Sequence, residues 1–295
     1  MNKKKILIFG SSGFIGSNLI NKISKKKYTI IKVNRNKFLS SNLKKRSNLF
    51  KKCDFVFHLA NQNNEQAANS NPLKDYKNNI NLTLKILETI KNLTSKPYLI
   101  YPSTVSLYKS SKLIRKENSK KSIISIYNTH KFFNEIYIKL YYKKYKINYI
   151  ILRISNVYGF NKKNNRGLLQ NLIFSNLKNK NVTLFNKGVQ YRDYIYIDDV
   201  IDAFLKILIN PQKGIFNLCS GKSYKFVEII KIIRNILKEK YKTFSQSKIV
   251  FKNNNEDLFN RNFIGSPLLF KKKYSWKNKT NLRKGIIKVI DKIKV

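Results

Sequence analysis

Tyr127 and Lys131 are spaced so that together they could move a proton. They lie four residues apart in a segment expected to form a helix, and residues i and i+4 share a helix face. An ammonium group near a phenol lowers the phenol pKa, which would let Tyr127 act as an acid or base near neutral pH. With 18 Tyr and 52 Lys in the chain, the alternative is a pair on an exposed helix face.

Ser103 and Thr104 add to this pair because they follow a strand-like run, Tyr98–Tyr101. Open α/β sheets bind their ligands at the carboxyl ends of the strands. At that position Thr104 could hydrogen-bond a carbonyl or hydroxyl group held by Tyr127. We therefore predict that Thr104, Tyr127 and Lys131 form a catalytic set.

A glycine-rich stretch near the N-terminus predicts a phosphate-binding turn. Gly10, Gly13 and Gly16 follow the apolar run Ile6–Phe9 and precede an amphipathic segment. Gly10 would permit the tight turn, Gly13 would let the backbone approach a pyrophosphate, and Gly16 would let the helix lie close to the strand. The helix N-terminus then offers free N–H groups to the phosphates. A purely structural turn is the alternative.

The elements that position these residues alternate between strand-like and helical patterns. We expect strands at Ile6–Phe9, Tyr28–Val33, Phe55–Leu59, Tyr98–Tyr101 and Tyr149–Arg153, with helices at Ser17–Lys26, Lys74–Asn92 and Ser125–Tyr145. This alternation predicts an α/β fold, with a parallel sheet and helices on both faces. The interval between Val33 and Phe55 shows no convincing strand, so one of the usual elements is expected to be trimmed.

The composition predicts a folded globular protein, and its charge would steer anionic small molecules toward it. The 295 residues are 42% hydrophobic, and no apolar run is long enough for a membrane span or a signal peptide. The two cysteines are too few for a disulfide framework or a cysteine-based metal site, and a reducing cytoplasm fits best. The formal charge of +46 comes from 52 Lys and only 9 Arg spread along the whole chain, so we expect no specific nucleic-acid partner.

Five further segments carry a family resemblance when they are taken with the glycine-rich turn. The chain resembles the extended short-chain dehydrogenase/reductase superfamily, in its NAD-dependent nucleotide-sugar epimerase/dehydratase branch. In order, Cys53–Ala60 resembles D-x-V-x-H-L-A-A, Asn79–Glu88 resembles N-x-x-G-T-x-N-x-L-E, Leu152–Gly159 resembles L-R-x-x-N-V-Y-G, Tyr191–Val200 resembles x-R-D-F-I-Y-V-D-D-V and Phe216–Gly221 resembles Y-N-I-G-S-G.

The resemblance implies a role for each matched residue. Tyr127 would be the catalytic acid/base, Lys131 would hold the nicotinamide ribose and Thr104 would orient the sugar. The implied cofactor contacts are Gly10, Gly13, Phe14, Ile15, Gly16, Asn34, Arg35, Leu59, Ala60, Asn79, Ser103, Tyr127 and Lys131. The implied substrate contacts are Thr104, Asn156 and Arg192.

Several of these assignments have alternatives or limits. Arg192 would pair with the phosphates of the nucleotide, and an ion pair with Asp193 or Asp198 is its alternative. Neither histidine, His58 or His130, receives a catalytic role. We expect no metal site.

The chain departs from the family pattern at two places. One departure argues against dehydration as the reaction, and the other leaves both NAD and NADP as candidate cofactors. Dehydratases of this branch carry Asp-Glu after the catalytic Thr, whereas Val105 and Ser106 follow Thr104, so 4,6-dehydration is not expected. Many NAD-binding relatives place an Asp after the second strand, where this chain has Asn34 and Arg35. A missing carboxylate removes repulsion toward a 2′-phosphate, so the cofactor is NAD or NADP.

The first functional hypothesis is a nucleotide-sugar epimerase that transiently oxidises a sugar carbon, most often C4. The alternatives are an NADPH-dependent reductase of nucleotide 4-keto-sugars and a non-catalytic member that binds a dinucleotide or RNA. We expect a Rossmann-type doubly wound sheet in residues 1–160 plus about 186–217. A smaller, interleaved C-terminal lobe would bind the nucleotide sugar with residues 161–185 and 218–295. A homodimer formed through Lys74–Asn92 and Ser125–Tyr145 is also expected.

Overall fold

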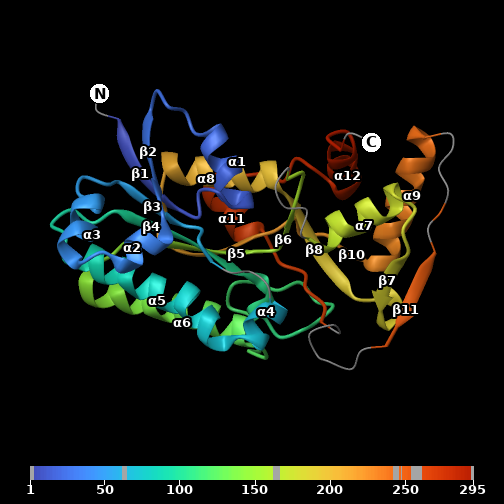
Figure 1. Cartoon of the computed structure of the whole chain (residues 1–295), viewed down its shortest axis with the longest axis horizontal. Helices are drawn as coiled ribbons and strands as arrows, with labels where there is room; N and C mark the ends of the chain where they lie inside the picture. Colours follow the sequence, from blue (N-terminus) through green and yellow to red (C-terminus); the bar gives the residue numbers. More distant parts are fainter. Residues whose placement is uncertain are drawn as a thin grey trace.

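The computed structural model describes residues 3–61, 65–161, 167–241, 246, 248–253 and 261–293. Within these residues the chain forms a central sheet covered by helices on both faces, with a smaller group of strands and helices beside it (Figure 1). Residues 162–166, part of the interval where the sequence predicts the second lobe to begin, lie outside the described residues.

The central sheet has six strands, and all of its neighbouring strands are parallel. The strand order is β2-β1-β3-β4-β5-β9. The strands are β1 (Lys4–Phe9), β2 (Tyr28–Val33), β3 (Phe55–His58), β4 (Tyr98–Thr104), β5 (Tyr149–Ile154) and β9 (Gly214–Leu218). The predicted Rossmann-type parallel sheet is confirmed.

Alternating side chains on β1 explain why helices cover both faces of the sheet. Leu7 and Phe9 are fully buried in the core shared with α5 and α6, whereas Ile6 and Ile8 are buried in the core on the opposite face. The helices of the first face are α2 (Arg35–Ser40), α3 (Leu43–Phe50), α5 (Pro72–Lys91) and α6 (Ile126–Tyr145). Those of the second face are α1 (Phe14–Lys22), α8 (Ile197–Ile209) and α11 (Leu268–Tyr274).

The interval between β2 and β3 contains helices and no strand, as predicted. The short helices α2 and α3 carry the chain across β1, from β2 on one side to β3 on the other. The sheet therefore ends at β2, without the strand that flanks this position in the commonest doubly wound order. The change of direction on either side of β1 places the glycine-rich turn at the point where such sheets bind ligands.

The smaller group of elements packs against the carboxyl end of the central sheet (Figure 1). It contains the sheet β10-β8-β6 and the parallel pair β11-β7. Its strands are β6 (Asn156–Tyr158), β7 (Val182–Phe185), β8 (Tyr191–Tyr196), β10 (Ser223–Lys225) and β11 (Ile249–Lys252). Its helices are α7 (Leu168–Leu177), α9 (Phe226–Lys240) and α12 (Leu282–Ile290).

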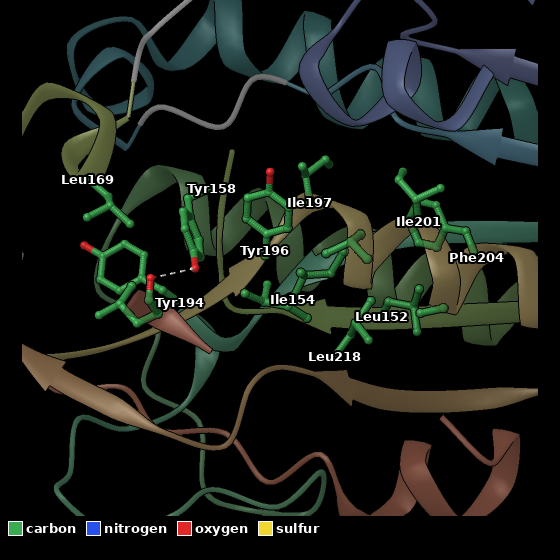
Figure 2. Close-up of a cluster of buried hydrophobic side chains, with 14 of the residues drawn as sticks. Leu152, Ile154, Tyr158, Leu169, Tyr194, Tyr196, Ile197, Ile201, Phe204 and Leu218 are labelled. Atoms are coloured by element: carbon green, nitrogen blue, oxygen red, sulfur yellow. Dashed lines mark hydrogen bonds between the residues drawn. The ribbon is translucent and has the colours of Figure 1, made fainter. Parts of the chain in front are cut away.

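One hydrophobic core joins the two parts. Tyr158, Tyr194 and Tyr196 pack edge to face, and the same core continues to Leu152 and Leu218 of the central sheet (Figure 2). Burial of this continuous surface holds the smaller part in a fixed position on the sheet. No helix in the described part of the chain is both long enough and apolar enough to cross a membrane.

Candidate active site

The glycine-rich turn joins β1 to α1 and leaves no room for side chains at two positions. Gly10 has a φ of +76°, and a Cβ placed on it would lie 2.6 Å from the carbonyl carbon of Leu59. A Cβ on Gly16 would lie 2.2 Å from the carbonyl oxygen of Gly10. Leu59 and Ala60, two predicted cofactor contacts, thus border the turn where β3 ends. Backbone crowding requires glycine at both positions.

The first turn of α1 fits the phosphates of a dinucleotide. Gly13 is the N-cap residue and provides no side chain to bind the first N–H groups of the helix, at Phe14, Ile15 and Gly16. A Cβ on Gly13 would lie only 3.2 Å from the oxygen of Gly10, which is a tight contact. Because Gly13 has no side chain, the N-terminal surface of α1 stays open. Uncapped N–H groups and the helix dipole together favour an anionic group.

The structure brings Thr104, Tyr127 and Lys131 together. Thr104 ends β4, and its side chain lies close enough to that of Tyr127, in the first turn of α6, to lower the Tyr127 pKa. The Nζ atom of Lys131 lies 5.9 Å from the centre of the Tyr127 ring and donates a 2.8 Å hydrogen bond to the carbonyl of Pro102. Both α6 residues are buried, so the alternative of an exposed helix pair is wrong.

Burial reverses the predicted effect on the phenol. The pKa of Tyr127 is raised, first by burial and then by the carboxylate of Glu65, while the neighbouring Thr104 hydroxyl lowers the pKa. Burial also lowers the pKa of Lys131 to about 7, although Asp75 and Glu135 oppose this shift. The expectation that Lys131 lowers the Tyr127 pKa is therefore wrong for the protein by itself, because desolvation dominates both groups.

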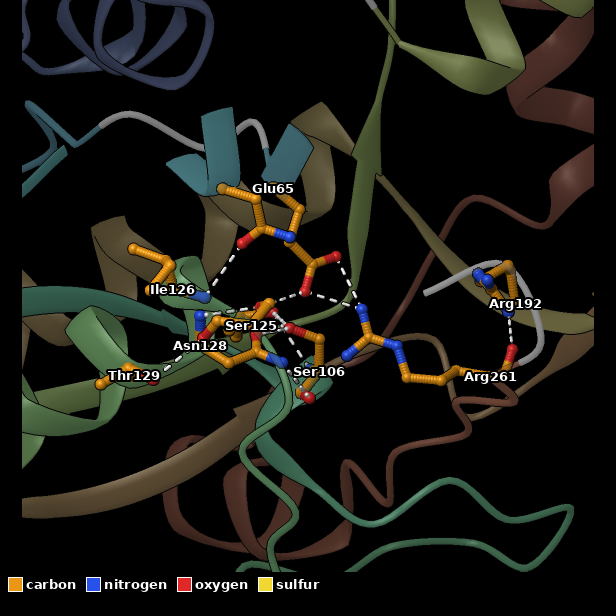
Figure 3. A network of polar contacts seen from close by, with 10 residues as sticks. Glu65, Ser106, Ser125, Ile126, Asn128, Thr129, Arg192 and Arg261 are labelled. Carbon is orange, nitrogen blue, oxygen red and sulfur yellow. Dashed lines mark hydrogen bonds and ion pairs between the residues drawn. The ribbon is translucent and has the colours of Figure 1, made fainter. Parts of the chain in front are cut away.

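A short series of hydrogen bonds through Ser106 and Asn128 holds the side chain of Thr104 in place. Its Oγ1 lies 3.0 Å from the Oγ of Ser106, and Ser106 donates a 2.8 Å hydrogen bond to Oδ1 of Asn128 (Figure 3). Asn128 returns a hydrogen bond to the carbonyl of Ser106. These contacts fix the end of β4 against α6. Neither Ser106 nor Asn128 was predicted from the sequence to have this supporting role.

Ser103 belongs to a buried ionic network next to the site. Its hydroxyl donates a 2.6 Å hydrogen bond to Glu135, which forms an ion pair with Arg153. Arg153 also donates to the hydroxyl of Tyr108 at 2.9 Å. The network joins β4, α6 and β5 next to the predicted catalytic residues, which restricts the movement of these elements.

The structure places the other predicted cofactor residues at the same edge of the sheet or on the adjoining helix. Asn34 follows β2 and caps α2, since its Oδ1 accepts a 3.1 Å hydrogen bond from the N–H of Lys37. Arg35 is the first residue of that helix. Asn79 is buried on α5, where its carbonyl accepts a hydrogen bond from Thr83.

The predicted substrate residues lie on the strands of the smaller sheet. Asn156 is exposed on β6 and donates to the carbonyl of Asp193 at 2.9 Å. Arg192 on β8 lies between the rings of Phe226 and Phe263, with its guanidinium carbon 5.4 Å from each ring centre. No ion pair joins Arg192 to Asp193 or Asp198 in the described part of the chain, so that alternative is wrong.

Arg261 lies beside Arg192 and was not among the residues predicted from the sequence. Its side chain pairs with Glu65, the first residue of α4 (Glu65–Ser70), and its carbonyl accepts a hydrogen bond from the Arg192 guanidinium (Figure 3). Nε and Nη1 of Arg261 are buried and have no hydrogen-bond partner among the described residues. The sequence offered one clue to Arg261. The chain contains 52 Lys and only 9 Arg, so an Arg at any position is unusual and suggests a need for a guanidinium group.

The two histidines occupy structural positions. His58 is fully buried and hydrogen-bonded to Thr83, and burial lowers its pKa to about 3, so it stays neutral. His130 pairs with the buried carboxylate of Asp75 at 2.6 Å. In the segments that the structure describes, no group of three or more His, Cys, Asp or Glu side chains could hold a metal ion.

Comparison with known proteins establishes the class to which this fold and site belong. The NAD dependent epimerase/dehydratase family model matches residues 6–219, and the chain belongs to this family. Its members bind NAD or NADP on a Rossmann fold and are enzymes of the extended short-chain dehydrogenase/reductase superfamily.

Individual relatives agree with this membership. The chain is 32% identical to a putative UDP-glucose 4-epimerase from Methanocaldococcus jannaschii over 78% of its own length and 81% of the relative. It is 30% identical to a dTDP-D-glucose 4,6-dehydratase from Dictyostelium discoideum, over 79% of the chain and 62% of that protein. The crystal structure of a UDP-glucose 4-epimerase from Thermotoga maritima with UDP-glucose superposes with a TM-score of 0.85, at 25% identity and 97% coverage of both chains.

Proposed function

We propose that the protein is an NAD(P)-dependent nucleotide-sugar epimerase that inverts a sugar carbon, C4, through a transient ketone. The observation that carries this proposal is the meeting of the Thr104 and Tyr127 side chains, with Lys131 beside them and the glycine-rich turn on the same sheet edge. These residues supply an acid/base and a hydroxyl ligand next to a dinucleotide site.

Each residue of the set has a distinct task. Tyr127 removes the proton of the sugar hydroxyl as hydride leaves the carbon, and returns the proton after hydride comes back on the other face. Thr104 holds the same sugar oxygen, and Lys131 binds the ribose hydroxyls of the cofactor. When bound, the oxidised dinucleotide supplies the hydride acceptor and a cationic ring that lowers the Tyr127 pKa.

The nucleotide end of the substrate would bind at the smaller sheet. Arg192 and Arg261 present guanidinium groups that suit a diphosphate, and Asn156 is exposed on the neighbouring strand. Residues 161–185 and 218–295, together with strands β6 and β8, would supply this lobe, and the rest of residues 1–160 and about 186–217 would bind the dinucleotide. The missing acidic pair after Thr104, where Val105 and Ser106 stand, favours epimerisation over dehydration.

Mass spectrometry of the cofactor released from the purified protein tests the dinucleotide. A panel of UDP-, dTDP- and ADP-sugars, followed by chromatography of the products, then tests the reaction. We expect retained NAD and conversion of one sugar into its C4 epimer without added cofactor. Absence of any bound dinucleotide, together with inversion at no carbon, would contradict the proposal.

One observation favours reduction of a 4-keto-sugar as a second candidate. No Asp or Glu occurs from Asn34 to Cys53, so the carboxyl end of β2 offers Arg35 but no carboxylate for a ribose. This arrangement tolerates a 2′-phosphate and hence NADPH as an exchangeable reductant. Stoichiometric consumption of NADPH with a nucleotide 4-keto-sugar would establish this alternative. Full function of Tyr127→Phe would instead revive a non-catalytic role.

Two further expectations concern assembly and location. Leu73 and Tyr76 on α5, with Phe133 and Leu140 on α6, are exposed apolar side chains on the two helices expected to pair between subunits. They support a homodimer, which sedimentation equilibrium would measure directly, and a monomer at micromolar concentration would contradict it. A cytoplasmic location remains a prediction from the low cysteine content.

A further inference from the structure

The carboxylate of Glu65 connects two distant parts of the active site. Its Oε1 atom accepts a 2.7 Å hydrogen bond from the hydroxyl of Ser125, and both of its oxygens lie 2.7 Å from Nη2 of Arg261 (Figure 3). Glu65 and Arg261 are 196 residues apart in the sequence. A single side chain therefore contacts both the helix of the acid/base and the segment that carries a guanidinium.

On the nucleotide side, Glu65 compensates a concentrated positive charge. Arg261 is 5% exposed, and its guanidinium carbon lies 5.1 Å from the ring centre of Phe263, the ring that Arg192 also contacts. Arg261 lowers the pKa of Arg192, after burial, while Glu65 opposes this shift. Glu65 therefore offsets the charge of both guanidinium groups, and within the part of the chain that the structure describes it pairs with Arg261 alone, through one nitrogen.

On the catalytic side, Glu65 reaches the start of α6. The hydroxyl of Ser125 accepts a 3.2 Å hydrogen bond from the N–H of Asn128 and donates its own proton to Glu65. Tyr127 lies two residues beyond this cap and is the residue whose pKa Glu65 raises. The other titratable groups facing Tyr127 are Tyr101 on β4, Asp75 on α5 and Lys131 on α6.

We propose that Glu65 is a positioning residue and the internal counter-ion of the site, joining the Arg192–Arg261 pair that receives the nucleotide diphosphate to the helix that carries Tyr127. This inference rests on the proposed function, because it takes the guanidinium pair to be the diphosphate site. Glu65 holds Arg261 by one nitrogen, and Nε and Nη1 are buried without a hydrogen-bond partner among the described residues, so an anion that displaces the atoms covering them would satisfy both donors. The same negative charge limits the affinity of the site for a second anion.

The proposed role and a merely structural role predict opposite changes in anion affinity when the charge of Glu65 is removed. Glu65→Gln keeps the size of the side chain and a hydrogen-bond acceptor for Ser125, but it removes the charge. Arg261 then stays buried without a counter-ion, and a diphosphate supplies the missing charge, so the anion binds more tightly. A purely structural role predicts weaker binding, because the arginine would lose its anchor.

Isothermal titration calorimetry with UDP, and with ADP in parallel, tests the nucleotide side. We expect the dissociation constant of the better nucleotide to fall about tenfold in E65Q at low ionic strength, where charge is least screened. Glu65→Asp keeps the charge and should stay within about threefold of the wild type. Asp75→Asn removes another carboxylate near Tyr127 that does not contact Arg261, and it should leave nucleotide affinity unchanged.

The pH profile of kcat/KM tests the catalytic side. The acidic limb, which reports ionisation of Tyr127, should move to lower pH in both E65Q and D75N, because each variant removes a negative neighbour. Only E65Q should change both the pH profile and nucleotide affinity.

Unchanged or weaker UDP binding in E65Q, or equal tightening in D75N, would overturn the role of Glu65 and leave the proposed function intact. If neither nucleotide binds even the wild type, the proposed function fails and this inference fails with it.

Discussion

The side chains of Thr104 and Tyr127 lie close to each other, and Thr104 lowers the Tyr127 pKa, although the two residues lie on different elements and 23 positions apart in the sequence. Thr104 ends a central strand of the sheet, and Tyr127 lies in the first turn of the helix that packs beside it. This contact defines where a sugar hydroxyl would have to bind. The first prediction therefore concerns the hydroxyl of Tyr127.

Replacing Tyr127 by Phe should lower kcat by about a thousandfold, because the acid/base is lost while the ring keeps its packing. The thermal unfolding midpoint and the amount of bound dinucleotide should change little. Tyr137→Phe, a half-buried hydroxyl deletion on the same helix, is the matched control and should retain activity. A Tyr127→Phe enzyme with more than a tenth of the wild-type kcat would be incompatible with the proposed role.

Lys131 should make stability depend on pH in a predictable direction. Its pKa is about 7 in the folded protein and 10.5 when solvated, so the unfolded chain binds more protons between these values. The cost of burying the ammonium is fully present below about pH 7 and disappears as the pH rises toward 10.5. Urea unfolding should show the wild type gaining stability relative to Lys131→Met across this range. A constant difference between the two proteins would contradict the shift.

Glu135→Gln should destabilise the protein by about 3 kcal/mol, because it leaves the Arg153 guanidinium buried with a weakened partner. Glu135 and Arg153 are almost completely buried, and their side chains approach to 2.6 Å. Chemical denaturation measures the change. Glu88→Gln removes a carboxylate from a partly exposed pair with Lys91 and should have a much smaller effect. Equal losses in the two variants would show that burial of the pair is unimportant.

Gly16→Ala should damage both stability and cofactor binding. The new methyl group would lie 2.2 Å from the Gly10 oxygen, a backbone atom that cannot move away cheaply, and we expect a loss of about 3 kcal/mol. Gly13→Ala meets its nearest atom at 3.2 Å and should fold with a smaller loss while still weakening dinucleotide binding. Thermal unfolding and the absorbance of released cofactor separate these effects. Normal cofactor content in both variants would argue against this turn as the phosphate site.

Asn34→Asp should reveal which dinucleotide the end of β2 accepts. Asp caps a helix as well as Asn does, so α2 and the thermal stability should be preserved. The new carboxylate would repel a 2′-phosphate and accept ribose hydroxyls, lowering NADP affinity at least about tenfold while NAD affinity holds or improves. Direct binding measurements with both dinucleotides check this outcome. Equal effects on NAD and NADP would place the adenosine ribose elsewhere.

Much of the fold was predictable because its signals are local. The strand of Ile6–Phe9, the helix containing Tyr127 and the absence of a strand between Val33 and Phe55 all follow from apolar periodicity over short stretches. The short strands β6 and β10 were not predicted, since three residues cannot show a periodic pattern. Pairing with β8, which comes from another part of the chain, stabilises them.

The sequence by itself determined the glycine-rich turn and the spacing of Tyr127 and Lys131, because both depend on neighbours within one element. Only the tertiary structure decided that burial raises the Tyr127 pKa, that Glu65 pairs with Arg261 and that Arg192 stacks between two phenyl rings. Desolvation and Coulomb energies depend on which distant segments are brought within a few ångströms. No spacing along the chain encodes those distances.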